Sequence, residues 1–354
     1  MAGEIIHWNI CGLKTKNNQY YKIKTETLTS FLEKTESTWI MNIQETHISK
    51  NEELPNFVKN YEHLFNFIIS NAPEDDTFAG LIVGIRKTER IISTVILESG
   101  RLIWVKVQNE ASNQITNIFS IYCKSSNSQK QKQLITKMKE HIIDNNLEDI
   151  LILGDFNFVT SILDRNNQTL NSIDLETKNV WDPFENENTL QDCFRLTNPK
   201  RRLYTFSSRS NQKIKSRIDR IYATPNLSGK ILSSQVLQTN ASDHKIVKVR
   251  MASHIDKGPG LWVFNSNLLK DNEYEEQITG IVNESERDRE NFIGDDKFYW
   301  DILQQQIMSF TKEFSKERAS KNNKSYHEWN KELEYLESLP RNKLTPGIIE
   351  KTAS

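Results

Sequence analysis

Short apolar runs alternate along the first 252 residues with segments whose apolar side chains recur every three or four positions. Runs of the first kind predict β-strands, and the three-to-four spacing predicts amphipathic helices. Helices are predicted over 21–35 and 129–146. Strands are predicted over 4–10, 38–44, 64–70, 79–86, 90–97, 102–107, 115–122, 149–153, 203–207, 217–223, 231–238 and 245–251. This order predicts an α/β protein with two packed mixed β-sheets flanked by helices, a four-layer sandwich, rather than a doubly wound parallel sheet.

The pattern changes after Met251. The sequence Lys257-Gly258-Pro259-Gly260 is typical of a turn or linker. Farther on, apolar residues return at helical spacing on both sides of the polar stretch 315–325, at Tyr299, Leu303, Ile307, Phe310, Phe314, Tyr326, Trp329, Leu333 and Leu336. We therefore expect a first domain over 1–252, a linker over 253–295, and a mainly helical C-terminal extension over 296–354 that contains two amphipathic helices.

Composition narrows the class of protein. The chain has 354 residues, of which 36% are hydrophobic and 26% charged, a balance that favours a globular protein over a disordered one. No apolar run approaches the roughly 20 residues of a membrane span, and the N-terminus lacks a signal peptide, so neither a membrane nor secretion is expected. The three cysteines, Cys11, Cys123 and Cys193, lack the spacing of a disulfide framework or a zinc finger, which indicates a reducing compartment.

The run Ile150-Leu-Ile-Leu-Gly-Asp155-Phe-Asn157 carries the strongest chemical signal. A buried strand leads into Gly154, and the two polar residues that follow are two positions apart. On an extended backbone such residues point the same way, so a carboxylate and an amide would share one site. This pair suits the orientation and deprotonation of a water molecule. The alternative is a loop in which both side chains only bond the local backbone.

Two other predicted strands end in oxygen-bearing side chains. Asn9 lies at the end of the run 4–10, and Glu45 follows the run 38–44. Oxygen donors of this kind suit Mg²⁺, which binds proteins through one or two carboxylates and keeps several waters. Taken singly, either residue is more simply a capping or turn residue.

A third pair combines Asp219 with His244. Both lie beside predicted strands, in Ser216-Arg-Ile-Asp-Arg220 and Ser242-Asp-His244. A carboxylate beside an imidazole can hold it oriented and charged, ready to stabilise a phosphoryl oxygen. A single histidine is usually structural, so this prediction depends on the whole set of five fragments at strand ends.

Together these fragments resemble the endonuclease/exonuclease/phosphatase superfamily, especially the apurinic-type endonucleases of LINE-type non-LTR retrotransposons. The resemblance extends over residues 4–251. Its motifs are Trp-Asn-Ile-x-Gly-Leu at 8–13, Ile-Gln-Glu-Thr-His at 43–47, Gly-Asp-Phe-Asn at 154–157, Ser-Arg-Ile-Asp-Arg-Ile at 216–221 and Ser-Asp-His at 242–244. One departure is Cys11, which stands where many members carry an acidic residue.

For the metal and the attacking water, the resemblance implies four residues. Glu45 and Asn9 would hold Mg²⁺, for which Mn²⁺ is a substitute. Asp155 would activate the water, and Asn157 would help to position it. These assignments agree with the chemistry expected of the strand ends.

For the phosphate, the resemblance implies a second set. Asp219 and His244 would form the orienting pair, and Asp243 would lie near the metal and its waters. Tyr122, at the end of the run 115–122, matches the phosphate-contacting tyrosine of the superfamily. Retrotransposon members often continue with Ala-Pro-Asn after this tyrosine, whereas this chain has Cys123-Lys-Ser.

DNA binding is expected from a basic hairpin. The net charge of the whole chain is only −1, so local clustering of cations decides the matter. The cations expected to contact backbone phosphates lie between the strands predicted at 203–207 and 217–223 and at the start of the second one: Arg209, Lys213, Lys215 and Arg217. Thr205 matches a position near the target strand in retrotransposon endonucleases. The alternative is a solvated hairpin tip.

The resemblance implies a Mg²⁺-dependent DNA endonuclease that hydrolyses a phosphodiester bond. It would nick double-stranded target DNA and leave a 3′ hydroxyl for target-primed reverse transcription. Alternatives are an abasic-site repair endonuclease or another phosphoesterase of the superfamily, such as an RNA deadenylase or a lipid or inositol phosphatase. An alternative of another class is a catalytically silent nucleic-acid-binding module.

Residues 258–274 resemble the segment that follows the endonuclease in LINE-type polyproteins. We therefore expect an N-terminal fragment of a longer chain, in which a downstream reverse transcriptase region and the element RNA are partners. The resemblance also implies nuclear action after a cytoplasmic ribonucleoprotein stage.

Overall fold

The computed structural model describes residues 2–13, 19–34, 38–50, 52, 55–208, 214–252, 264, 266–289 and 296–338. The chain divides into two units, the first built mainly from Met1–Asp256 and the second from Lys257–Leu333. Among the helices that the structure describes, none combines the length and the apolar character needed to span a bilayer.

Two six-stranded sheets form the centre of the first unit. The strands of the first sheet are β1 (Ala2–Asn9), β2 (Thr38–Gln44), β3 (Phe65–Ser70), β4 (Leu81–Arg86), β13 (Ile231–Leu237) and β14 (Ile246–Ala252), in the order β13-β14-β1-β2-β4-β3. Those of the second sheet are β5 (Glu89–Glu98), β6 (Leu102–Asn109), β7 (Ile115–Tyr122), β8 (Ile150–Asp155), β9 (Gln191–Asp192) and β12 (Asp219–Ala223), in the order β5-β6-β7-β8-β12-β9. Neighbours β1 and β2 run parallel, as do β7 and β8, and the other neighbouring pairs are antiparallel.

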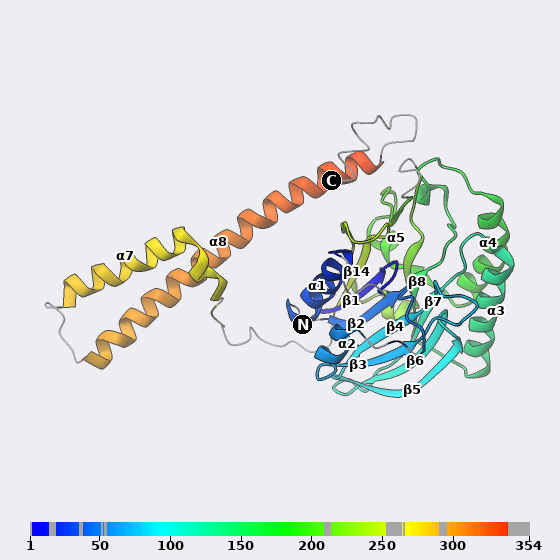
Figure 1. The fold of residues 1–354 in the computed structure, drawn as a ribbon, viewed down its shortest axis with the longest axis horizontal. Coiled ribbons are helices and arrows are strands. Elements are labelled where there is room, and N and C mark those ends of the chain that lie inside the picture. Colours follow the sequence, from blue (N-terminus) through cyan, green and yellow to red (C-terminus); the bar gives the residue numbers. More distant parts are fainter. Residues whose placement is uncertain are drawn as a thin grey trace. The chain divides into compact units, whose positions relative to one another are not determined.

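Helices cover the outer faces of these sheets, which confirms the predicted four-layer α/β sandwich. Figure 1 shows α3 (Ser128–Asp144) and α4 (Ser172–Glu187) side by side along the second sheet, and α1 (Gln19–Lys34) beside the first. Ile135 and Met138 of α3 are buried in one cluster with Phe119 and Ile152. Leu28 of α1 packs in a separate cluster with Ile6 and Trp8. The shorter elements are α2 (Asn56–Tyr61), α5 (Cys193–Thr197), α6 (Pro225–Ser228), the 3₁₀ turn η1 (Ile162–Asp164), and the small ribbon of β10 (Phe206–Ser207) and β11 (Lys215–Ser216).

The alternation of side chains along each strand decides what lies between the sheets. In β8, Leu151 and Leu153 belong to the apolar cluster shared by both sheets, whereas Ile150 and Ile152 belong to the cluster with α3. The next residue on the inner face is Asp155, which is fully buried. The layer between the sheets is therefore apolar along most of its length and polar where β8 ends.

The second unit contains a helical hairpin. It holds η2 (Ser266–Lys270), α7 (Asn272–Asp288) and most of α8 (Asp296–Ser338). Tyr274 of α7 is buried against the rings of Phe310 and Phe314, and its hydroxyl lies 2.7 Å from Thr311 Oγ1. The contacts of Tyr274 explain why a helix forms inside the stretch 253–295 that was predicted as a linker.

The prediction of two separate helices in the extension is also corrected. The structure has one continuous helix of 43 residues, α8. The polar stretch 315–325 contains neither glycine nor proline, so nothing in its backbone chemistry interrupts the helix. The function of this extension and the boundary after 252 stay predictions.

Candidate active site

Six polar residues of the first unit gather where strands of both sheets end. The parallel neighbours β1 and β2 end side by side, as do β7 and β8, and the first residue of β12 lies opposite the last residue of β8. The loop that leads into β14 returns beside β1. These elements position Asn9, Glu45, Tyr122, Asp155, Asp219 and His244.

Unusual backbone conformations occur at the strand ends around the site. Glu45 and Asn157 have φ angles of 52° and 53°, in the left-handed region that side-chain-bearing residues seldom occupy. Residues held in this region cluster at functional sites. Gly154 meets a different demand: a Cβ atom there would lie 1.8 Å from the carbonyl oxygen of Ile121, so only glycine allows β8 to lie this close to β7.

The carboxylate of Glu45 is held by two donors. The Tyr122 hydroxyl donates to Oε1 over 2.6 Å, and the Asn9 amide donates to the same oxygen over 2.8 Å. Burial would raise the pKa of Glu45, but the nearby His47 imidazole, 3.7 Å from Oε2, the charge of His244 and the hydrogen bonds from Tyr122 and Asn9 outweigh it and lower the pKa. Glu45 is therefore an anion at neutral pH.

Asp155 has the opposite electrostatic environment. Asn9 Nδ2 lies 2.9 Å and Asn157 Nδ2 3.1 Å from its Oδ2, and the backbone N–H of Asn157 donates to Oδ1. Burial, followed by the nearby charges of Asp219 and Glu45, raises the pKa of Asp155 in spite of the charge of His244. A carboxylate with a raised pKa is suited to accept a proton near neutral pH.

His244 and Asp219 form the predicted pair. His244 Nδ1 lies 2.8 Å from Asp219 Oδ2, and His244 Nε2 lies 3.8 Å from Asp155 Oδ2. Burial disfavours the charged imidazole, but Asp219 and Asp155 outweigh it and raise the pKa of His244 to about 10. His244 lowers the pKa of Asp219, which is an anion. The pair thus presents a cationic ring nitrogen to Asp155.

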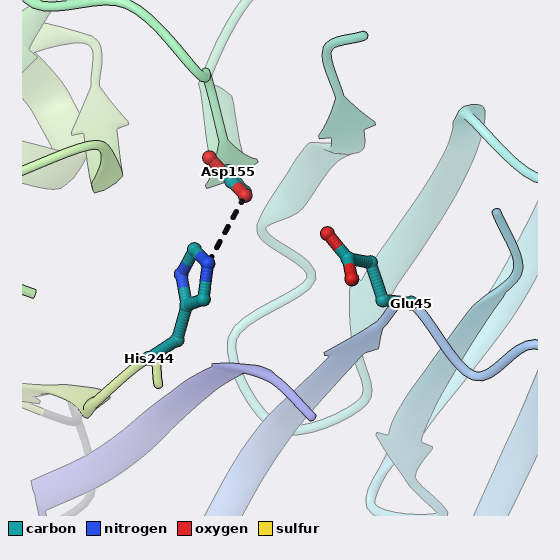
Figure 2. A group of neighbouring side chains, drawn as sticks. All are labelled: Glu45, Asp155 and His244. Atoms are coloured by element: carbon teal, nitrogen blue, oxygen red, sulfur yellow. Dashed lines mark ion pairs between the residues drawn. The ribbon is translucent and has the colours of Figure 1, made fainter. Parts of the chain in front are cut away.

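A divalent cation suits this arrangement. Glu45, Asp155 and His244 offer ligand atoms that all lie within 4.8 Å of one another, and Figure 2 shows the two carboxylates and the ring converging. Because His244 is protonated, its ring does not suit a metal, and the two carboxylates are the groups that could hold one. Tyr122 and Asn9 both bond Oε1 of Glu45 and leave Oε2 to other partners. Hard oxygen donors with an excess of negative charge are what Mg²⁺ requires.

One predicted position differs from expectation. The Asn9 amide nitrogen faces both carboxylates, and its oxygen accepts the N–H of Cys11, so Asn9 ties Glu45 to Asp155 instead of offering an oxygen to a metal. Asp243 directly precedes His244, and its backbone carbonyl accepts the N–H of Ser207. Its place near the metal and its waters stays a prediction. Asn157 lies where it was predicted, bonded to Asp155.

Three residues predicted to contact DNA are buried: Arg217, Thr205 and Lys215. Arg217 is 1% exposed, and its guanidinium bonds the carboxylates of Asp164 and Asp192. Thr205 Oγ1 accepts the backbone N–H groups of Ile218 and Asp219, so it holds the start of β12.

Lys215 is buried in β11, the second strand of the small ribbon. Thr205, Lys215 and Arg217 are therefore not available to DNA in this conformation, which corrects the expectation for all three. Arg209 and Lys213 lie outside the described residues.

Sequence reasoning missed a set of buried polar side chains behind the site. Each lies two positions from another inward-facing residue of its strand, on a face that is mostly apolar. The sequence does display this spacing. Gln44 Oε1 accepts the backbone N–H of Asp155, and His7 Nε2 lies 3.1 Å from Asp219 Oδ1. The set consists of His7, Asn42, Gln44 and Ser120.

Comparisons with known proteins agree with this architecture. The model of the Endonuclease/Exonuclease/phosphatase family matches residues 6–244. The transposon TX1 uncharacterized 149 kDa protein of Xenopus laevis is 25% identical over 252 residues, which cover 70% of this chain. The chain spans only 19% of the length of that relative.

Solved structures show the same fold. AP endonuclease LMAP from Leishmania major has a TM-score of 0.59 at 16% identity, and the match covers 71% of this chain and 88% of that one. The 3′ phosphatase NExo from Neisseria, solved with a product DNA hairpin, has a TM-score of 0.55 at 16% identity, covering 71% and 100%. At these identities the likeness concerns the fold alone.

Proposed function

This chain belongs to the endonuclease/exonuclease/phosphatase family, and from that premise we propose that it is a Mg²⁺-dependent DNA endonuclease. It nicks one strand of double-stranded DNA and leaves a 3′ hydroxyl that primes reverse transcription. The observation that carries the proposal is the convergence of Glu45, Asp155 and His244. The similarity to a transposon protein favours DNA cleavage among the activities of the family.

The chemistry follows from the electrostatics of the side chains. Asp155, held at the end of β8, takes the proton of the attacking water. Asn157 holds the Asp155 carboxylate from both backbone and side chain. Glu45, together with Asp155, would hold Mg²⁺, which supplies charge stabilisation at the leaving oxygen.

The phosphate is bound from the opposite side of Asp155. His244, kept protonated by Asp219, donates from Nε2 to a phosphoryl oxygen on which charge develops. Tyr122 fixes Glu45 by donating its hydroxyl proton to Oε1. These roles need no movement of the sheets, because every donor is already held by a strand end.

DNA is the proposed substrate for two reasons. The Neisseria enzyme of the same fold was solved with a DNA hairpin, and the curated relative is a transposon protein. In the proposal, Arg209 and Lys213, which lie in the sequence between β10 and β11, contact backbone phosphates. In the full-length protein the partners are a downstream reverse transcriptase region and the element RNA, and the complex acts in the nucleus after a cytoplasmic stage.

An abasic-site endonuclease is the second candidate, favoured by the likeness to the Leishmania enzyme. One experiment separates the candidates. The purified chain is incubated in three parallel reactions, all containing Mg²⁺. The substrates are supercoiled plasmid, an abasic duplex and phosphoinositide vesicles. We expect open-circular plasmid whose nicks a DNA polymerase extends without prior end repair. Cleavage restricted to the abasic duplex selects the repair enzyme, and phosphate release from the lipid selects a phosphatase. Binding without cleavage of any substrate selects a silent binding module.

A further inference from the structure

The carboxylate of Asp219 is bonded by two imidazoles, of which the pairing with His244 uses only one. His244 Nδ1 lies 2.8 Å from Oδ2, and His7 Nε2 lies 3.1 Å from Oδ1. His7 belongs to β1 of the first sheet, whereas Asp219 begins β12 of the second. Both side chains are completely buried. Each oxygen of this carboxylate therefore has its own imidazole partner.

The hydrogen bonds behind His7 determine which of its ring nitrogens carries the proton. Gln44 Oε1 accepts the N–H of Asp155, and Gln44 Nε2 donates to the carbonyl of Ile121 and to Ser120 Oγ. Backbone N–H groups only donate and carbonyls only accept, so the orientation of the Gln44 amide is fixed. Since Ser120 Oγ accepts from Gln44, its own proton goes to Asn42 Oδ1, which lies 2.6 Å away.

The Asn42 amide extends this chain of hydrogen bonds to His7. Its oxygen accepts from Ser120, and its nitrogen faces the carbonyl of Leu153 and His7 Nδ1, at 3.4 Å and 3.1 Å. The nitrogen is thus the donor, and Nδ1 of His7 is an acceptor without a proton. The remaining proton of His7 lies on Nε2, where it is donated to Asp219 Oδ1. A relay of fixed direction therefore joins the backbone of Asp155 to the side chain of Asp219.

We propose that His7 is a positioning residue of the active site: its Nε2–H fixes the plane of the Asp219 carboxylate and, through it, the direction of the His244 imidazole. The inference rests on the proposed nuclease function. Terminal rotation of an Asp side chain is soft, so a bond to one oxygen leaves the carboxylate free to turn. Donors on both oxygens remove that freedom. His244 Nε2 is then held on the side of Asp155, where the reacting phosphate must lie.

A packing role alone is the competing explanation, and two substitutions separate the roles. The amide nitrogen of glutamine reaches the place of a histidine Nε2, so His7→Gln keeps a donor for Asp219. His7→Leu keeps apolar volume but removes the donor. Loss of an outer hydrogen-bond partner commonly lowers activity by about 10- to 100-fold, so we expect that loss in kcat for His7→Leu, with little change in KM. His7→Gln should retain most of the activity. Ile5→Val, on the same face of β1, is the matched control with unchanged kcat.

Two further measurements, made on the full chain at constant pH, test the path through Asp219. In a His244→Ala background, His7→Leu should cause no further fall in kcat. In proton NMR of the otherwise unchanged chain, the downfield Nδ1–H signal of His244 should persist in His7→Gln and shift or broaden in His7→Leu. The proposal is overturned by full activity of His7→Leu, by equal losses in both variants, by additive losses with His244→Ala, or by an unchanged His244 signal in His7→Leu. If the unaltered chain cleaves no DNA, the proposed function fails while the NMR result still decides the positioning role.

Discussion

Two buried clusters of charged side chains lie in the first unit, and they differ in how their charges balance. In the cluster proposed to be catalytic, called the catalytic cluster below, Glu45, Asp155 and Asp219 supply three carboxylates against the single cationic ring of His244. In the second cluster, Asp164 and Asp192 face two guanidinium groups, those of Arg195 and Arg217. The first cluster has an excess of negative charge, and the second is neutral.

The titration behaviour of the clusters follows the same difference. In the neutral cluster burial acts against charge, yet Arg217 overcomes it and lowers the pKa of Asp164, while Asp164 and Asp192 raise that of Arg217. In the catalytic cluster the pKa of Asp155 is raised by burial and by the other carboxylates. In a cluster whose charges balance, the loss of one partner leaves an uncompensated buried charge, whereas a cluster with excess negative charge suits an added cation. Burial and charge alone would not distinguish the two; the balance of charge does.

The largest expected effect comes from Asp155→Asn. Loss of a general base commonly lowers a rate by about 10² to 10⁴, so plasmid nicking should fall by that factor. The midpoint of thermal unfolding should change little, because removing a charge that its surroundings disfavour offsets the loss of one hydrogen-bond acceptor. Nicking gels and thermal melts in EDTA measure both. Asp144→Asn, the same change at an exposed position of α3, should alter neither, and a large loss of stability in Asp155→Asn would contradict the charge balance described above.

In the neutral cluster, Arg217→Met should lower the stability and leave the activity of the folded protein unchanged, the opposite of the effects expected for Asp155→Asn. Removing one partner leaves Asp164 and Asp192 buried with too little positive charge, which commonly destabilises a protein by about 3 to 5 kcal/mol. Urea unfolding should show that loss, while nicking per folded molecule stays near normal below the transition. Arg250→Met, at a half-exposed pair with Glu4, is the control and should change the stability by no more than about 1 kcal/mol. A selective loss of activity in Arg217→Met would make the second cluster part of the site.

The two clusters should also have opposite pH dependences in EDTA. The pKa of Asp164 is lowered by folding, so its contribution to stability is present above the unfolded pKa of about 3.9 and is lost as the pH falls below it. The pKa of Asp155 is raised, so its contribution is present below about pH 3.9 and is lost as the pH rises toward neutrality. The deficit of Asp164→Asn should therefore shrink in acid, and any advantage of Asp155→Asn should grow toward pH 7. Urea unfolding from pH 3 to 8 checks both trends, and parallel trends would refute the contrast.

The smallest expected effect concerns cations outside both clusters. If Arg209 and Lys213 each neutralise one phosphate, each contributes a slope of about −0.9 to log K against log salt for duplex DNA. The double variant Arg209→Ala/Lys213→Ala should flatten the measured slope accordingly, whereas Lys137→Ala on α3 should not. Fluorescence anisotropy at several salt concentrations measures the slope. An unchanged slope would place the DNA contacts elsewhere.

Sequence predicted the catalytic cluster better than the neutral one because of where the information lies. Glu45, Asp155 and His244 stand at strand ends inside short motifs, and parallel strands bring such ends together. Arg217 was assigned to DNA because its partners Asp164 and Asp192 are 53 and 25 residues away, and nothing local shows that they neutralise it. His7 was missed for the same reason, since 212 residues separate it from Asp219.

The elements show a similar limit. The strands were predictable because buried β-runs are continuous and apolar. The helix α4 was not, because Pro183 and several charged residues interrupt its pattern, and its capping box at Asn171 and Asp174 was overlooked. In α8 the polar stretch 315–325 predicts a break between two helices, but its residues are compatible with one continuous helix. Local composition signals where a core face stops; it does not by itself show where a helix ends.

We propose that the excess negative charge around Asp155 serves a divalent cation used in DNA cleavage. Plasmid nicking as a function of Mg²⁺ concentration, compared between the unaltered chain and Glu45→Gln, tests this role. We expect no nicking in EDTA, recovery on adding Mg²⁺, and a strongly reduced response in Glu45→Gln, which keeps the size of the side chain but removes its charge. Nicking that persists in EDTA, or an identical Mg²⁺ response in both proteins, would rule this role out.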